Sequence, residues 1–167
     1  VSGTCPGCDA FGSRDDDGDP WAGDYDRDGD LVIENQGGSV NLKWTGEDLT
    51  FTSITAFETF ERFYEEDTDV SPAKIVHNTY EAEIDQFTQE FRLGGESGGL
   101  NWLAGAYYYD QKTDGAFQID ASGIDYISGD ANYDQETKSW SLFGQLENAL
   151  SDYWGVLAGL RYTDEER

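Results

Sequence analysis

Apolar and polar residues alternate along most of this chain, and a period of two predicts β-strands. The clearest run lies near the C-terminal end, where the alternate positions are Trp154, Val156, Ala158, Leu160 and Tyr162. Successive side chains of a strand point to opposite faces, so these five positions share one face. The pattern therefore predicts a sheet with one apolar face and one polar face.

The alternation predicts six long strands whose connections differ regularly in length. The expected strands are residues 39–44, 49–60, 85–93, 100–110, 137–150 and 153–163. The short turns at 45–48, 94–99 and 151–152 alternate with long polar segments at 61–84 and 110–136. Short turns on one side and long loops on the other are typical of outer-membrane barrels, although soluble antiparallel sheets also alternate. We expect an all-β antiparallel meander of about six strands that forms part of a transmembrane β-barrel.

The first part of the chain follows a different pattern. Residues 1–37 contain nine Asp and one Glu, many glycines and few apolar side chains. Such a segment cannot bury a core and is expected to be a loop. The predicted organisation is an acidic Asp/Gly-rich loop segment over residues 1–37, followed by a partial domain of barrel-type strands over residues 38–167.

Charge and composition narrow the classes of partner. The chain carries 35 acidic and 10 basic residues, a formal net charge of −25. Nucleic acid and anionic lipid headgroups both attract basic surfaces, so the charge argues against binding to either. The 5 Trp, 10 Tyr and 9 Phe argue against a disordered chain, because disordered chains are poor in aromatic residues.

Several strand segments resemble those of one protein family. The segments QFTQEFRL (86–93) and LNWLAGAYYY (100–109) closely resemble barrel strands of TonB-dependent outer-membrane receptors. The segments SLFGQ (141–145) and AGLRYTDE (158–165) resemble the next hairpin of the same family, and TSITAF (52–57) resembles the strand upstream. The resemblance extends over roughly residues 38–167, in the order and spacing of the family.

The resemblance implies a function and a location. Such receptors have a barrel of about 22 strands and an N-terminal plug, and they take up scarce nutrients such as ferric siderophores, vitamin B12 or oligosaccharides with energy delivered through TonB. It implies residence in the outer membrane of a Gram-negative bacterium, in contact with lipid, with residues 1–37, 61–84 and 110–136 as extracellular loops. We expect the chain to be a fragment that needs the plug and the remaining strands, because about 8 strands form the smallest closed bacterial barrel.

Two other interpretations stay open at this point. An open six-stranded sheet leaves two unpaired edges, and bare edges recruit further strands. A receptor-derived fragment could therefore self-associate into an extracellular β-rich, amyloid-like filament, with its sheets stacked on one another. A soluble calcium-binding β-domain is the third interpretation.

The acidic segment contains a candidate calcium site. Asp24, Asp26, Asp28 and Asp30 alternate, and Gly29 takes the turn position, as in the first half of a calcium-binding loop. The pattern is incomplete, because Asn35 occupies the position where such a loop has a bidentate Glu. Glu34 lies directly before it. The predicted Ca²⁺ ligands, which include a second cluster upstream, are Asp15, Asp17, Asp19, Asp24, Asp26, Asp28, Asp30 and Glu34. The alternative is a solvated acidic loop outside the cell.

Outside the acidic segment, few residues suggest a disulfide, a metal site or catalysis. Cys5 and Cys8 form a single CxxC motif, which predicts a small structural disulfide in an oxidising compartment. A zinc site is disfavoured there, because the sequence has no second CxxC and His77 is the only histidine. We find no catalytic set built on that single histidine, so the sequence predicts that the chain is not an enzyme.

Overall fold

The computed structural model describes residues 5–8, 12, 14, 18–19, 21–124 and 128–167. Within these residues the chain forms six strands and one short 3₁₀ helix, η1 (Ser122–Ile124). The strands are β1 (Asp30–Thr45), β2 (Leu49–Asp67), β3 (His77–Ser97), β4 (Leu100–Asp120), β5 (Gly129–Ala149) and β6 (Gly155–Glu166). No helix in this described part is both long and apolar enough to cross a membrane.

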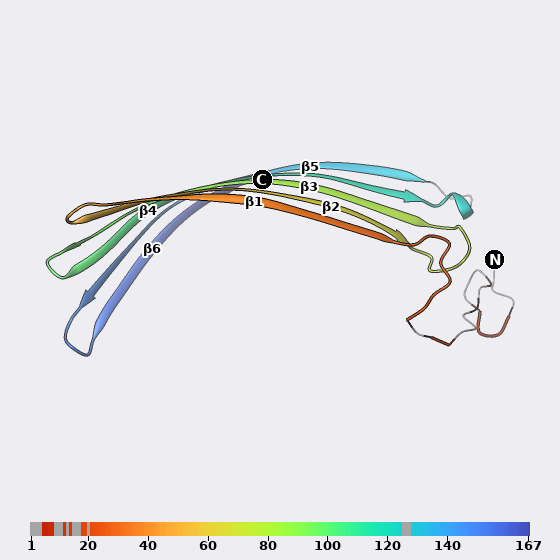
Figure 1. Ribbon diagram of the computed structural model, residues 1–167, viewed down its shortest axis with the longest axis horizontal. Helices are drawn as coiled ribbons and strands as arrows, with labels where there is room; N and C mark the ends of the chain where they lie inside the picture. Colours follow the sequence, from red (N-terminus) through yellow and green to blue (C-terminus); the bar gives the residue numbers. More distant parts are fainter. Residues whose placement is uncertain (1–4, 9–11, 13, 15–17, 20, 125–127) are drawn as a thin grey trace. The chain divides into compact units, whose positions relative to one another are not determined.

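Each strand pairs with its neighbours in the sequence. The sheet order is β1-β2-β3-β4-β5-β6, so β1 and β6 form its two edges (Figure 1). The pairing of β5 with β6 is antiparallel and runs from Lys138 opposite Glu166 to Ala149 opposite Gly155. The predicted all-β antiparallel meander of six strands is confirmed.

The contacts within the chain divide it into two compact units. Unit 1 consists of residues 1–34, 61–83 and 114–133, and unit 2 consists of residues 35–60, 84–113 and 134–167. The short turns after β1, β3 and β5 belong to unit 2, whereas the connections after β2 and β4 belong to unit 1. The predicted alternation of short and long connections therefore corresponds to this division.

The strands are longer than the sequence pattern indicates. β1 begins at Asp30 and not near residue 39, and the two predicted loops shrink to residues 68–76 and 121–128. The added strand ends contain many charged side chains, and β1 begins with the consecutive apolar residues Leu31, Val32 and Ile33, so the alternation does not extend clearly through them. Their backbones still pair, because the hydrogen bonds of a ladder join main-chain groups and do not require apolar side chains.

Glycines make the turn between β3 and β4. Gly98 and Gly99 have φ angles of 61° and 82°, a left-handed conformation that L-residues with side chains rarely adopt. Two successive positive φ values are required by the tight hairpin turn that matches the twist of antiparallel strands. The predicted turn at 94–99 is therefore confined to its last two glycines, and β3 continues to Ser97.

Very few apolar side chains are buried. Among the described residues, the buried apolar side chains are Ile75 and Ala121, and both belong to unit 1. The many Trp, Phe, Leu and Val side chains of the strands stay exposed. The sheet is therefore not stabilised by a central core, and its apolar side chains lie on a surface.

Candidate functional site

Apolar side chains of β5 and β6 gather on one face of unit 2. Leu142 lies opposite Tyr162 in the strand pairing, and the ring centroids of Trp140 and Tyr162 are 5.6 Å apart. These side chains are all exposed, and Leu160 keeps 87% of its surface accessible. A monomeric soluble protein rarely exposes so continuous an apolar patch, so this surface is suited to contact something apolar.

Aromatic rings extend the same surface across β2, β3 and β4. The ring centroids of Phe51 and Phe91 are 6.0 Å apart, and those of Phe57 and Phe87 are 5.0 Å apart. Phe87 also contacts Tyr108, with 6.2 Å between the centroids. We call this surface of unit 2, from Phe51 and Phe57 to Leu160 and Tyr162, the apolar face.

The polar side chain of Gln89 lies on the apolar face, and neighbouring groups form hydrogen bonds with both its oxygen and its nitrogen. The Thr55 hydroxyl donates to Oε1 of Gln89 over 2.6 Å. Nε2 of Gln89 donates to the Ser53 hydroxyl and to the Ile54 carbonyl, each over 3.1 Å. A polar group paired in this way can tolerate an apolar environment, because it leaves no donor or acceptor without a partner.

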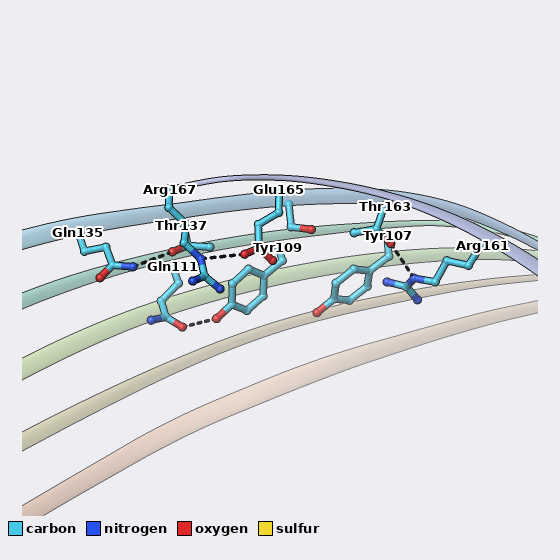
Figure 2. Close-up of a pocket in the computed structure, with 10 residues that line it drawn as sticks. Tyr107, Tyr109, Gln111, Gln135, Thr137, Arg161, Thr163, Glu165 and Arg167 are labelled. Carbon is cyan, nitrogen blue, oxygen red and sulfur yellow. Dashed lines mark hydrogen bonds and ion pairs between the residues drawn. The ribbon is translucent and has the colours of Figure 1, made fainter.

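The opposite face of unit 2 is polar and contains an open pocket of about 540 Å³ (Figure 2). Its lining side chains come from alternate positions of β4, β5 and β6 and from Arg167, directly after β6, and they are mostly hydrogen-bonding groups. They are Tyr107, Tyr109, Gln111, Gln135, Thr137, Ser139, Arg161, Thr163, Glu165 and Arg167. We call this surface the polar face.

Arg161 is the central cation of the pocket. Its guanidinium carbon lies 5.6 Å from the centre of the Tyr107 ring and 5.8 Å from that of Phe143. Its Nε donates to the Thr163 hydroxyl over 3.1 Å, as Figure 2 shows. The two rings and the hydroxyl hold the guanidinium in place while leaving donors for a ligand.

Further polar contacts order the rest of the pocket. The Tyr109 hydroxyl donates to Gln111, whose Nε2 donates to the Thr113 hydroxyl over 3.0 Å. Nε of Arg167 lies 2.8 Å from a carboxylate oxygen of Glu165. Guanidinium groups beside aromatic rings can bind an anionic or planar ligand by charge-assisted hydrogen bonds and stacking.

Unit 1 contains a cluster of three titratable side chains. Nε2 of His77 lies 2.8 Å from Oδ1 of Asp26, a residue 51 positions earlier in the chain. His77 is 4% exposed, and the side chain of Asp26 is 16% exposed although its backbone faces solvent. Asp67 is the third member, and the ligand atoms of all three side chains lie within 4.8 Å of one another. We call these residues the Asp-Asp-His cluster.

The pKa values of Asp67, the last residue of β2, and of Asp69, in the β2–β3 connection, shift in opposite directions. Burial, with the charge of Asp69 nearby, raises the pKa of Asp67. Burial alone would also raise the pKa of Asp69, but hydrogen bonds from the Ser71 hydroxyl and the Val76 amide lower it. These bonds to Asp69 are 2.5 Å and 2.7 Å long, so Asp69 is the carboxylate that the connection holds ionised.

The structure distributes the predicted calcium ligands over several places. Asp15 and Asp17 lie outside the described residues, and Asp19 accepts a hydrogen bond from the Trp21 amide. Asp24 and Asp28 are exposed in the segment before β1, whereas Asp30 and Glu34 lie on β1 itself. Among the described members of this set, Asp26 alone belongs to a group with metal-ligand distances. Calcium binding by the set stays a prediction.

The predicted disulfide is present. It joins Cys5 and Cys8, whose Cα atoms are 5.5 Å apart. The Cys8 amide donates to the Cys5 carbonyl over 3.2 Å, which closes the same small turn. The disulfide restrains only a short loop, so its role is local.

Sequence reasoning missed two members of the Asp-Asp-His cluster. Asp67 ends β2 and His77 begins β3, so the cluster forms when the two strands pair and residues 21–29 pass beside them. The spacing along the chain gave no sign of this arrangement. The available signal was a single histidine in a strongly acidic chain.

The sequence also matches a known family. Residues 6–167 match the family described as TonB dependent receptor-like, beta-barrel. The match covers nearly the whole chain and agrees with the antiparallel meander and its two different faces. The chain belongs to the β-barrel domain family of TonB-dependent receptors.

Solved structures of similar fold are siderophore receptors. The ferric yersiniabactin uptake receptor FyuA from Yersinia pestis matches with a TM-score of 0.68 and 14% identity, over 81% of this chain and 21% of that receptor. The siderophore receptor PiuA from Acinetobacter baumannii matches with a TM-score of 0.50 and 15% identity, over 81% of this chain and 29% of that receptor. The chain thus spans less than a third of either receptor. A comparison with curated protein sequences found no match.

Proposed function

We propose that this chain is a six-stranded segment of an outer-membrane receptor that takes up a scarce nutrient with energy delivered through TonB. The observation that carries the proposal is the contrast between the two faces of unit 2. The apolar face exposes aromatic and aliphatic side chains, and the polar face carries the Arg161 pocket. Alternation of lipid-facing and lumen-facing side chains is the arrangement of a transmembrane barrel wall.

In this proposal the apolar face contacts lipid and the polar face lines the barrel interior. The short turns of unit 2 lie on the periplasmic side, and the long connections of unit 1 lie outside the cell. Several strands have 19 to 21 residues, about twice the 9–11 that cross a bilayer. The strand ends in unit 1 therefore extend beyond the membrane, which fits their many acidic residues.

The proposed nutrient is a ferric siderophore. The likeness in fold to two siderophore receptors supports this class over vitamin B12 or an oligosaccharide. The pocket chemistry supports it as well, because Arg161 beside the Tyr107 ring suits an anionic ligand with planar groups. In this role the polar face binds and passes a ligand, and no catalytic step is required.

The partners follow from the size of the family's barrels. Six strands cannot close a barrel, so β1 and β6 would pair with further strands of the receptor, and a plug would fill the interior. We propose that the segment is not competent for transport by itself. The similarity to receptors of known fold favours this arrangement over a self-assembled filament.

A matched pair of lysine substitutions tests the membrane orientation. Leu160 lies on the apolar face of β6, and Gln145 lies on the polar face of β5, paired with the residue next to Leu160. In the complete receptor, Leu160→Lys is expected to destabilise the inserted barrel by about 2–4 kcal/mol if the site is near the membrane centre. Gln145→Lys is expected to leave insertion unchanged. The heat-dependent gel shift of folded barrels, after insertion into lipid vesicles, measures both.

Two results would contradict the proposal. One is equal insertion of the Leu160→Lys and Gln145→Lys receptors. The other is the recovery of long filaments of the wild-type chain from detergent-free buffer, with Leu160→Lys blocking filament growth. The second result would assign the apolar face to an interface between copies of the chain.

A further inference from the structure

The Asp-Asp-His cluster joins three separate parts of unit 1. Asp26 comes from the segment before β1, Asp67 from the end of β2 and His77 from the start of β3. All three are within 4.8 Å of one another through atoms that can bind a metal ion. A hydrogen bond between Asp26 and His77 accounts for two of the three side chains without a metal, but it does not account for Asp67.

Asp67 provides a second, independent observation. Its Oδ1 accepts a hydrogen bond from the Val70 amide over 3.1 Å. Its Oδ2 is inaccessible to solvent and has no hydrogen-bond partner among the described residues. A buried carboxylate oxygen without a partner is rare in native proteins, and a bound ion is one of the few explanations for it.

We propose that the Asp-Asp-His cluster binds a first-row divalent metal ion of the zinc class. The ligands are His77 through Nε2 and one carboxylate oxygen each from Asp26 and Asp67. This set differs from the predicted calcium ligands, with which it shares only Asp26. The site goes beyond the proposed transport function and does not depend on it.

The donor set favours zinc over calcium. Imidazole nitrogen is a preferred ligand of Zn²⁺ and related ions, whereas Ca²⁺ takes six to eight oxygen ligands. Three protein ligands leave a fourth tetrahedral position for water. Ligand atoms around Zn²⁺ lie about 3.4 Å apart, given bonds of about 2.0–2.2 Å. The Asp26–His77 pair, at 2.8 Å, must therefore open slightly.

Metal binding would change the hydrogen bonding of His77. In the metal-free structure Nε2 of His77 forms a hydrogen bond with Oδ1 of Asp26. Coordination requires the Nε2 lone pair, so the ring must carry its proton on Nδ1 in the metal complex. The hydrogen bond between Asp26 and His77 is then replaced by one metal bond to each side chain.

The ion would tie the acidic segment to the strands. Without the ion, the Asp26 amide donates to the Ser71 carbonyl in the β2–β3 connection, and its carboxylate forms a hydrogen bond with His77 on β3. Metal bonds to Asp67 and His77 would restrain residues 21–29 much more strongly. The expected consequence is that zinc protects this segment from proteolysis.

The test is a zinc titration of the complete receptor after removal of metal by a chelator, with calorimetry as the readout. The wild-type receptor is expected to bind Zn²⁺ at this site, with at least tenfold weaker affinity in His77→Gln and in Asp26→Asn. Asp28→Asn is the matched control, because it removes the same charge two residues away from Asp26, outside the cluster. Co²⁺ absorption, read in the same variants, reports directly on coordination by His77.

Each outcome decides the proposal. Loss of affinity in His77→Gln and Asp26→Asn, with Asp28→Asn unchanged, supports it, provided that the gel shift shows all three variants folded. An equal loss in all acidic variants would show diffuse attraction to negative charge, and unchanged affinity in every variant would place the zinc elsewhere. Competition by an equal concentration of Ca²⁺ would also overturn it. The lysine test of membrane orientation involves neither zinc nor unit 1, so the two proposals fail separately.

Discussion

The phenyl ring of Phe143 on β5 covers the backbone of Gly105 on β4. A Cβ atom at position 105 would overlap that ring, so only glycine allows this close approach. The same ring lies 5.8 Å from the guanidinium carbon of Arg161. The absence of a side chain at Gly105 therefore helps to place the central cation of the polar pocket.

The contact makes Gly105 sensitive to the smallest substitution. Gly105→Ala is expected to displace the Phe143 ring and destabilise the folded barrel by about 1–3 kcal/mol, as overpacking does elsewhere. Gly144→Ala is the control, because a Cβ at position 144 would meet its nearest neighbour at an ordinary 3.6 Å. Denaturant unfolding of both variants measures the difference. Equal stability of the two would show that the Phe143 ring can move aside freely.

The contact between Arg161 and Tyr107 should be measurable as a coupling energy. A double-mutant cycle with Arg161→Met and Tyr107→Leu is expected to give about 0.5–1 kcal/mol of interaction free energy in unfolding experiments. The same cycle with Arg167→Met in place of Arg161→Met serves as the control and is expected to give a value near zero. A similar coupling for both arginines would mean that general charge, and not the ring contact, stabilises the pocket.

The hydrogen bonds of Gln89 on the apolar face are expected to stabilise the folded barrel. Gln89→Leu removes the acceptor of the Thr55 hydroxyl and is expected to destabilise the barrel by about 1–3 kcal/mol. Adding Thr55→Val removes the orphaned hydroxyl as well, so the double variant should recover part of the loss. Unfolding midpoints in detergent test the expected order of stability, in which the double variant lies between the wild type and Gln89→Leu. A double variant less stable than Gln89→Leu would contradict it.

The β4–β5 connection is expected to loosen in acid. The hydroxyl and amide of Ser122, and then the Ser128 hydroxyl, lower the pKa of Asp120 below its ordinary 3.8. Because the folded-state pKa is the lower one, this stabilisation is fully present above 3.8. It is lost as the pH falls through the folded-state value.

Hydrogen exchange of residues 121–124 measures this effect, after correction for the pH dependence of exchange itself. Asp120→Asn should show at neutral pH the weak protection that the wild type shows only in strong acid. Asp120 and Asp130 both line an open pocket of unit 1, so Asp130→Asn removes an equal charge from the same region and is the control. If both variants lose protection equally, the net charge of the loop and not the Asp120 hydrogen bonds sets its stability.

The meander could be predicted because its signals are local. Alternation within a strand shows which side chains share a face, and short glycine-containing turns show which strands are neighbours. The outer strand ends could not be predicted, since the pairing of His77–Ile84 or Gly129–Glu136 depends on main-chain groups that every sequence has. Charged side chains are frequent in these stretches, and sequence reasoning interprets such stretches as loops.

The candidate sites were even less predictable from local sequence patterns than the strand ends. The polar position of Arg161 follows from strand periodicity, but its contact with Phe143 depends on the relative positions of adjacent strands. The alternating Asp residues from Asp24 to Asp30 predict a calcium loop, and β1 begins at the last of them. His77 and Asp26 are 51 positions apart in the sequence, so no local spacing predicts their contact.

The order β1-β2-β3-β4-β5-β6 has a consequence for how barrels of this kind change over evolutionary time. Because every strand pairs only with its neighbours in the chain, a hairpin is one contiguous stretch of gene. Duplicating or deleting such a stretch would alter the circumference by two strands while leaving the remaining pairs and their registers intact. The meander thus permits a family to change pore width in single genetic steps, without redesigning the wall.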